Sequence, residues 1–202
     1  MNSVIQAIKE RRSIRNFEEK EVDKEIIKEI IQAGKFAPSA ENRQPWRFIV
    51  ITNKDFIKEL SAMIKEELKK LLKKRFIKKF SIKELREESV MKLLYGVAFS
   101  QKDLIFFDAP VVIFILTKNE LFNNESCACC AQNMMLAAHS LGLGSCWIGF
   151  ASILGFKKEA MQKIGAPEGY HIAATLVLGY PKGKIKKAPL RKIEADIIKW
   201  IE

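Results

Sequence analysis

The stretch APSAENRQPWRF, residues 37–48, carries more chemistry than a connecting loop requires. Its two prolines restrict the backbone, while Ser39, Asn42 and Gln44 offer short hydrogen-bonding groups. Trp46 adds a flat aromatic surface. Binding residues concentrate on loops that a scaffold holds in place, so this set suits a flat heteroaromatic ligand edged with carbonyl and ring-nitrogen atoms. A well-formed turn without any ligand would use the same residue types, and both interpretations stay open on this stretch alone.

An amphipathic helix and an apolar strand are predicted on either side of this loop. Asp23 is a typical N-cap, isoleucines repeat at helical spacing after it, and Gly34 is predicted to end the helix. Residues Phe48–Ile51 form a short apolar run that predicts a buried strand.

The same reading places elements along the rest of the chain. It predicts a helix capped by Ser3 and running to about Arg11, two helices separated by the capping box Ser81–Glu84, a helix ended by Asp108–Pro110, a strand at Val111–Leu116, a central buried helix at about Ser126–Leu141, a short helix at Phe156–Ile164, a strand at Ile172–Leu178, and an amphipathic tail at Ile193–Trp200.

A second chemically dense segment lies near the N-terminus. Arg11, Arg12 and Arg15 flank Ser13 and place three guanidinium groups and a hydroxyl within five residues. Such groups converge only on an anion, and arginine binds phosphate through two hydrogen bonds at once. An exposed basic loop is the alternative interpretation.

Length and composition predict one globular domain spanning residues 1–202. Of its 202 residues 48% are hydrophobic, which is typical of a folded core rather than of disorder. Apolar runs stay below the ~18 residues that a membrane-spanning helix needs. Glu10 and Arg11 stand where a signal peptide would be apolar, so we expect a cytoplasmic protein.

Four cysteines and two histidines leave little basis for a metal site. Cys127, Cys129 and Cys130 match no common zinc or iron–sulfur spacing, and small buried helix residues are the expected role. His139 lies on the same predicted helix and is expected to be a hydrogen-bonded core residue rather than a catalytic one. No metal is predicted.

The net charge of +11 raises the possibility of nucleic-acid binding. Much of the excess is lysine on a predicted helical face within residues 54–79 and in the tail 182–192, where a solvated surface is the usual explanation. Aromatic residues for base stacking are not interleaved with these charges, so a general attraction for anionic ligands is the preferred interpretation.

The combination of motifs resembles the FMN-dependent nitroreductase family. In the family's order the chain has RRSIR at residues 11–15, APSAENRQPW at 37–46, LGLGSCWIG at 141–149 and LGYP at 178–181. The resemblance implies an α+β fold with a central mixed, mostly antiparallel sheet flanked by helices, in an interwoven homodimer with two FMN sites. Residues 53–107 match no motif, and Ala40 stands where the family often has Ser or Thr.

The resemblance also implies which residues hold FMN. The phosphate and ribityl end would be held by the N-terminal motif and a tail cation, the ring edge by Arg15, the segment at 147–149 and, from the partner subunit, the loop at 38–44. The implied cofactor-binding residues are Arg11, Arg12, Ser13, Arg15, Pro38, Ser39, Ala40, Asn42, Gln44, Trp147, Ile148, Gly149, Lys187 and Arg191, with Lys186 as another candidate for the tail cation.

The implied activity is an NAD(P)H oxidoreductase that reduces nitroaromatics, quinones or other electron-poor acceptors. One pocket would serve NAD(P)H and acceptor in turn, which predicts ping-pong kinetics, and no catalytic side chain is required because the flavin carries the chemistry. The alternatives are a related flavin enzyme that dehalogenates, supplies reduced flavin or breaks flavin down, and a non-enzymatic FMN carrier or redox sensor.

Overall fold

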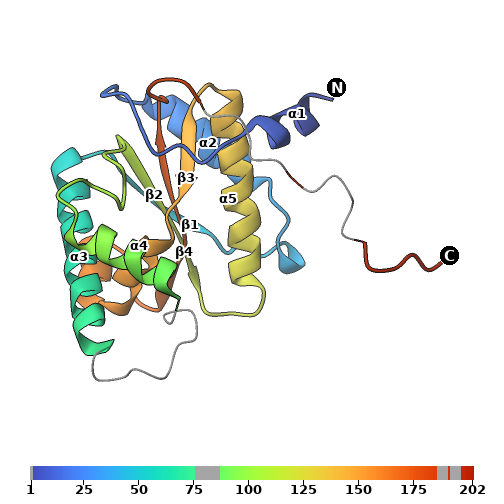
Figure 1. Cartoon of the computed structure of the whole chain (residues 1–202). Helices are drawn as coiled ribbons and strands as arrows, with labels where there is room; N and C mark the ends of the chain where they lie inside the picture. The colour runs from blue at the N-terminus through green and yellow to red at the C-terminus, as the bar shows by residue number, and fades with distance from the viewer. Residues whose placement is uncertain (1, 76–86, 186–190, 192–196) are drawn as a thin grey trace.

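Helices on two sides enclose a four-stranded sheet (Figure 1). The computed structural model describes residues 2–75, 87–185, 191 and 197–202. In chain order the elements are α1 (Ser3–Glu10), α2 (Lys24–Lys35), the 3-10 helix η1 (Ala40–Asn42), β1 (Arg47–Ile51), α3 (Lys54–Arg75), α4 (Glu88–Phe99), β2 (Val111–Lys118), α5 (Asn123–Ser140), β3 (Gly144–Trp147), the 3-10 helix η3 (Gly149–Phe156), α6 (Lys158–Lys163) and β4 (Tyr170–Gly179).

The sheet has the strand order β1-β2-β4-β3, and each neighbouring pair is antiparallel. The predicted α+β class is therefore confirmed, with an antiparallel sheet among the described residues. Strands β2 and β4 lie in the centre, and their β-branched and apolar residues are buried from Val111 to Thr117 and from Ala174 to Gly179.

Two separate hydrophobic clusters cover the two faces of the sheet. One joins α3, α4, η3 and α6 to the face that carries Phe114 and Val177. The other joins α2 and α5 to the face that carries Ile113 and Leu176. Alternate residues of a strand point to opposite faces, so β2 and β4 supply side chains to both clusters.

Several sequence expectations hold with small shifts, and others are wrong. Asp23 caps α2 as predicted, whereas Asn2 rather than Ser3 caps α1, its Oδ1 accepting from Val4 N at 2.9 Å. Strand β1 is an edge strand with only Ile51 buried, not a buried strand, because it has a neighbour on one side alone.

Two expected helices differ because side chains or backbone end them early. Helix α4 stops at Phe99, and residues 100–110 form turns held by the Asp103 carboxylate, which accepts from Ile105 N and Phe106 N. The predicted helix Phe156–Ile164 is divided into the end of η3 and α6. Residues 197–202 are not helical, and the capping box at 81–84 lies outside the described residues.

Helix α5 is buried on one face only, not nearly all round as its composition predicted. Its buried face meets the sheet and α2, while Cys129 and Gln132 are exposed. Small residues such as Ala and Cys are compatible with either environment, so composition could not distinguish them.

Gly34 is the last residue but one of α2, one position before the helix ends, and it permits a close contact between α2 and α5. A Cβ atom at this position would lie 2.5 Å from Met134 Cγ and 3.0 Å from Cys130 Sγ. Met134 is fully buried, so its side chain has little room to move away. Glycine is therefore required by the packing of two helices.

We expect Gly34→Ala to lower the free energy of unfolding by about 1–3 kcal/mol, because it overpacks this contact. The matched control is Gly96→Ala in α4, where an added Cβ meets nothing within 4 Å in the described structure. That control should raise stability by up to ~1 kcal/mol, since alanine favours a helix over glycine. Denaturant unfolding measures both, and equal effects of the two substitutions would contradict the packing argument.

Candidate functional site

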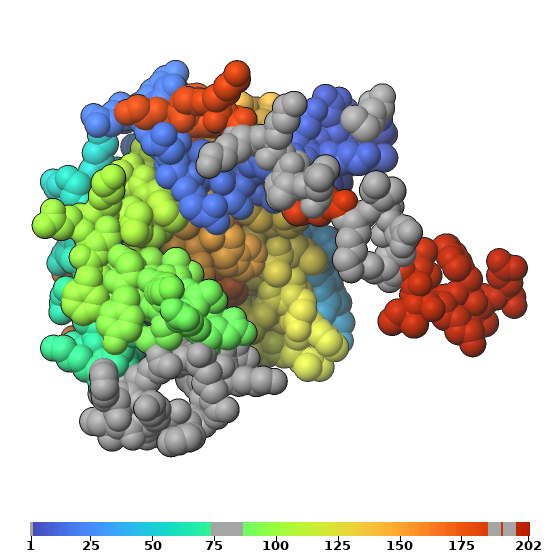
Figure 2. Space-filling model, in the orientation of Figure 1, coloured from blue at the N-terminus to red at the C-terminus, as the bar shows by residue number. Residues whose placement is uncertain are grey.

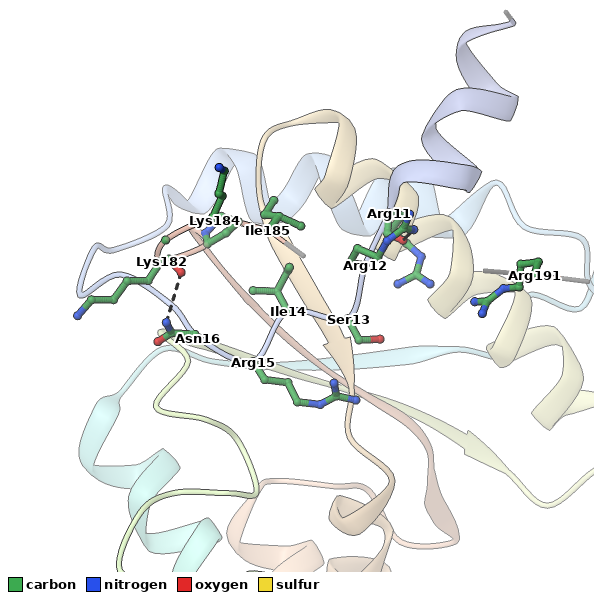
Figure 3. A pocket seen from close by; sticks show the side chains of 12 residues that line it. Arg11, Arg12, Ser13, Ile14, Arg15, Asn16, Lys182, Lys184, Ile185 and Arg191 are labelled. Carbon is green, nitrogen blue, oxygen red and sulfur yellow. Dashed lines mark hydrogen bonds between the residues drawn. The ribbon is translucent and has the colours of Figure 1, made fainter. Parts of the chain in front are cut away.

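A basic pocket lies where the segment after α1 meets the segment after β4. Its volume is about 660 Å³, within the range of small-ligand sites. The lining residues are Arg11, Arg12, Ser13, Ile14, Arg15, Asn16, Pro181, Lys182, Gly183, Lys184, Ile185 and Arg191. Figure 3 shows the guanidinium groups of Arg11, Arg12 and Arg191 on one side of this lining, with Lys182 and Lys184 pointing away from them.

Backbone hydrogen bonds hold the N-terminal segment against the sheet. Ile14 N donates to Ser145 O at 2.9 Å, and Lys182 N donates to Asn16 O at 3.0 Å. Gly144 permits the first of these contacts, because a Cβ there would lie 2.7 Å from the Ile14 side chain. The LGLG motif thus has a packing role next to the pocket.

The pocket concentrates positive charge that its described lining residues do not neutralise. Six of its lining residues are Arg or Lys, and none of the described lining residues is acidic. Arg12 Nη1 donates to the carbonyls of Lys9 and Arg11 at the end of α1, a capping role that the sequence reading missed. Yet Arg12 Nε and Arg11 Nη1 are buried without a hydrogen-bond partner among the described residues.

Guanidinium nitrogens that are buried without a partner among the described residues fit an anionic ligand. Arginine cannot lose its charge in a protein, and an unpaired buried donor is costly. Arg12 Nε and Arg11 Nη1 are therefore suited to oxygen atoms of a phosphate group, which would satisfy both charge and hydrogen bonding.

Arg15 and Ser13 lie next to Cys146 in the edge strand β3. Burial raises the pKa of the Cys146 thiol, and the neighbouring Arg15 charge and Ser13 hydroxyl partly oppose that rise. The Arg15 guanidinium also lies 5.8 Å from the centre of the Phe107 ring. Phe107 comes from the segment that matched no motif, and only the tertiary structure brings it to Arg15.

The segment Trp147–Gly149 follows Cys146 directly and joins the end of β3 to the start of η3. Ile148 N donates to Thr175 O at 2.8 Å, so this N–H group is used within the protein and is not free for a ligand. Trp147 and Gly149 are exposed, and a Cβ on Gly149 would meet nothing within 4 Å in the described structure. Figure 2 shows the chain after β3 set back between the N-terminal segment, α4 and α5.

The loop at residues 38–44 forms a strained, outward-facing turn. Glu41, Asn42 and Gln44 have φ of 53°, 54° and 48°, a left-handed conformation that costs roughly 1–3 kcal/mol for each such residue. Ser39 Oγ accepts from Gln44 N at 3.1 Å, and Gln44 Nε2 donates to Asn42 Oδ1 at 3.1 Å. Asn42 and Gln44 are exposed, and their pair keeps Asn42 Nδ2 as a donor and Gln44 Oε1 as an acceptor for a ligand.

The structure corrects the expected role of Trp46. This side chain is 3% exposed and belongs to the core cluster with α2 and α5, so it anchors the end of the loop and offers no free surface to a ligand. Pro38 is exposed, and Ser39 and Ala40 are half-buried.

Within one chain the two groups of candidate residues lie at opposite ends of α5 (Figure 1). Ala40 N donates to Ser126 Oγ near the start of α5, whereas Ile14 is bonded to Ser145, just beyond its end. A helical rise of 1.5 Å per residue puts these points roughly 20 Å apart. The basic pocket therefore collects the Arg11–Arg15 segment and Arg191 but not the loop, and Lys186 and Lys187 lie outside the described residues.

The remaining candidates have structural roles or none. Burial raises the pKa of Cys127 to about 11 and that of Cys130 to about 12, so both thiols are protonated core residues as expected, whereas Cys129 is exposed. The described ranges contain no group of three or more His, Cys, Asp or Glu residues placed to hold a metal ion. His139 is half-buried. Among the described helices, none combines the length and apolar character needed to span a bilayer.

Comparison with known proteins agrees with this geometry. The family model described as "Nitroreductase family" matches residues 8–180, a range that includes the pocket, the loop and the segment after β3. The chain belongs to the Nitroreductase family. The match therefore confirms the resemblance to nitroreductases that the sequence motifs indicated.

Individual relatives cover almost the whole chain. It is 26% identical over 204 residues to the oxygen-insensitive NADPH nitroreductase of Helicobacter pylori, which covers 97% of this chain and 95% of that protein. It is 27% identical over 193 residues to the nitrobenzene nitroreductase of Ectopseudomonas oleovorans, covering 86% and 84%. A crystal structure of a nitroreductase with bound FMN from Desulfitobacterium hafniense superposes with a TM-score of 0.78 at 25% identity, covering 100% of both chains.

The raised pKa of Cys130 predicts a specific loss of stability at high pH. Its ordinary value is 9.0, so the unfolded thiol ionises first and the folded one resists ionisation until about 12. The free energy of unfolding therefore keeps the contribution of the Cys130 thiol below pH 9. It loses that contribution as the pH rises from about 9 towards 12, at about 1.4 kcal/mol per pH unit.

Denaturant unfolding of wild type and Cys130→Ala at pH 8 and above pH 9.5 measures this effect. The free energy of unfolding of the wild type should fall relative to that of the variant. A difference between the two proteins that does not change with pH would contradict the assignment.

Proposed function

We propose that this protein is an FMN-dependent NAD(P)H oxidoreductase that reduces electron-poor acceptors such as nitroaromatics or quinones. The observation that carries the proposal is the basic pocket on Arg11–Arg15, in which the described residues supply neither an acidic side chain nor a partner for the buried guanidinium nitrogens. FMN ends in a phosphate, which is the group those nitrogens require. The FMN-bound relative and the NADPH nitroreductase among the similar proteins support the same cofactor and donor.

In this proposal each part of the site has a separate task. Arg11, Arg12 and Arg191 hold the phosphate, with Lys187 as a further candidate, and Ser13 contacts the ribityl chain. Arg15 places a fixed positive charge at the edge of the ring. Trp147–Gly149 borders the ring, with Gly149 offering its backbone N–H.

A second copy of the chain completes the site in our proposal. One chain separates its pocket from its loop by roughly 20 Å, so Pro38, Ser39, Ala40, Asn42 and Gln44 would serve the pocket of the other copy. Unpaired apolar surface supports an extensive homodimer. Val4, Ile5 and Ile8 of α1, together with Ile198, Trp200 and Ile201 of the tail, are 48% exposed or more.

Bound FMN would supply hydride transfer between NAD(P)H and the acceptor. The protein binds both substrates in turn at one pocket, orients them against the ring and favours negative charge beside Arg15. Protons can come from solvent, so no side-chain acid or base is assigned. A cytoplasmic location belongs to the proposal, because free thiols fit a reducing compartment in which NAD(P)H is available.

The absorption spectrum of the purified protein tests the function. We expect flavin absorbance in the visible region and its loss after anaerobic addition of NADH or NADPH. Initial rates at varied NAD(P)H and quinone concentrations should give parallel double-reciprocal lines, because the substrates share one pocket. A colourless protein that does not bind added FMN would refute the proposal, whereas a yellow protein that never oxidises NAD(P)H would be an FMN carrier or sensor.

Arg15→Ala tests the charge at the ring. Loss of this cation should weaken FMN binding about five- to tenfold and lower the two-electron midpoint potential by about 20–40 mV, since ~1–2 kcal/mol of charge stabilisation is lost from the reduced state. Lys182→Ala is the matched control, because Lys182 also lines the pocket but points away (Figure 3). Equal FMN affinity and midpoint potential in Arg15→Ala and wild type would remove Arg15 from the proposed site.

A further inference from the structure

The loop that presents Asn42 and Gln44 is strained, so the surrounding protein must hold it. Three non-glycine residues in it have positive φ, and the amide pair that faces outward sits on two of them. Hydrogen bonds inside the loop shape the turn, such as Asn42 N to Ser39 O at 3.0 Å. These internal bonds do not fix the turn relative to the body of the molecule.

Arg43 supplies a side-chain connection from the loop to the body of the molecule. Its Nη2 donates to Leu121 O at 2.9 Å, and its Nε donates to Ala40 O at 3.2 Å. One planar guanidinium thus bridges the loop and the turn before α5. The side chain is 32% exposed, and weaker ion pairs to Glu41 at 3.6 Å and Glu120 at 3.9 Å complete its surroundings.

The turn before α5, to which Arg43 is hydrogen-bonded, is held in place by further hydrogen bonds. Asn123 is buried, and its Nδ2 donates to Lys118 O at 3.2 Å. Ser126 Oγ donates to Phe122 O at 2.8 Å and accepts from Ala40 N at 3.4 Å, so it gives the loop a second connection to α5. The end of β2 and the start of α5 therefore fix the turn, and Arg43 fixes the loop to that turn.

We propose that Arg43 is a positioning residue that sets the orientation of Asn42 and Gln44 towards the flavin of the partner subunit. The inference rests on the proposed function, which makes that amide pair a flavin contact. Arg43 itself touches neither flavin nor substrate. Its role depends on the planar guanidinium, which holds Nε and Nη2 at fixed positions towards Ala40 O and Leu121 O, whereas lysine offers a single nitrogen atom on a flexible stem.

Arg43→Ala tests the role in the full-length dimer. FMN affinity of the flavin-free protein should fall by up to about tenfold, the change expected when a neutral amide loses its hydrogen bond to the flavin. The visible circular dichroism of bound flavin should also change, because the amide pair no longer has a fixed orientation. Arg43→Lys should resemble Arg43→Ala rather than wild type, and it serves as the test protein if the alanine variant does not fold.

Three controls make the outcomes distinguishable. Glu120→Gln removes an ion pair but leaves the bond to Leu121 O, so its FMN affinity should stay within twofold of wild type. Lys28→Ala removes an exposed cation on α2 as a charge control. Asn42→Ala tests the flavin contact directly.

If Asn42→Ala weakens FMN binding but Arg43→Ala stays within twofold of wild type, the inference is wrong and the proposed function stands. Full recovery in Arg43→Lys, or an equal loss in Glu120→Gln, would also overturn it, because charge rather than the fork would then matter. If the wild-type protein binds no FMN, the proposed function itself fails.

Discussion

Positive charge that no described residue of the pocket neutralises is the constraint around which this molecule is arranged. Arg11 and Arg12 cannot lose their protons, and each has a buried nitrogen without a partner among the described residues. Backbone bonds to Ser145 and Tyr180 keep the segment in place despite the mutual repulsion of its cations. Buried donors without partners lower the stability of the folded protein. Such donors are typical of a binding site, where a bound ligand accepts their hydrogen bonds.

The second constraint is the separation of the two chemically specialised segments. Helix α5 stands between them, with the strained loop bonded near its start and the basic segment bonded beyond its end. A rigid helix of 18 residues does not allow them to approach within one chain. Apolar side chains on α1 and the tail are exposed in the single chain and could be buried against a second copy, which is consistent with the proposed shared site.

Strain and anchoring recur on both sides of the proposed site. The loop at 38–44 has three positive φ values and is tied to the turn before α5 by Arg43. On the other side, Phe107 and Asp108 also have positive φ, and the Asp103 carboxylate holds the turn that brings Phe107 to Arg15. Arg43 lies within the motif at residues 37–46, whereas Asp103 lies in the segment that matched no motif. Each side chain fixes a turn next to a residue that is proposed to meet the ligand.

The sequence by itself determined the family, the α+β class and, to within a few residues, the boundaries of α2, β2 and β4. Local rules were sufficient there, since the Asp23 cap and the apolar run from Val111 depend on neighbouring residues only. Tertiary structure decided what depends on distant partners. It buried Trp46, placed Gly34 inside a helix contact, used the N–H of Ile148 for Thr175, and brought Phe107 to Arg15 and Arg43 to Leu121. Those contacts join residues far apart in the chain, and no local pattern encodes which of them will meet.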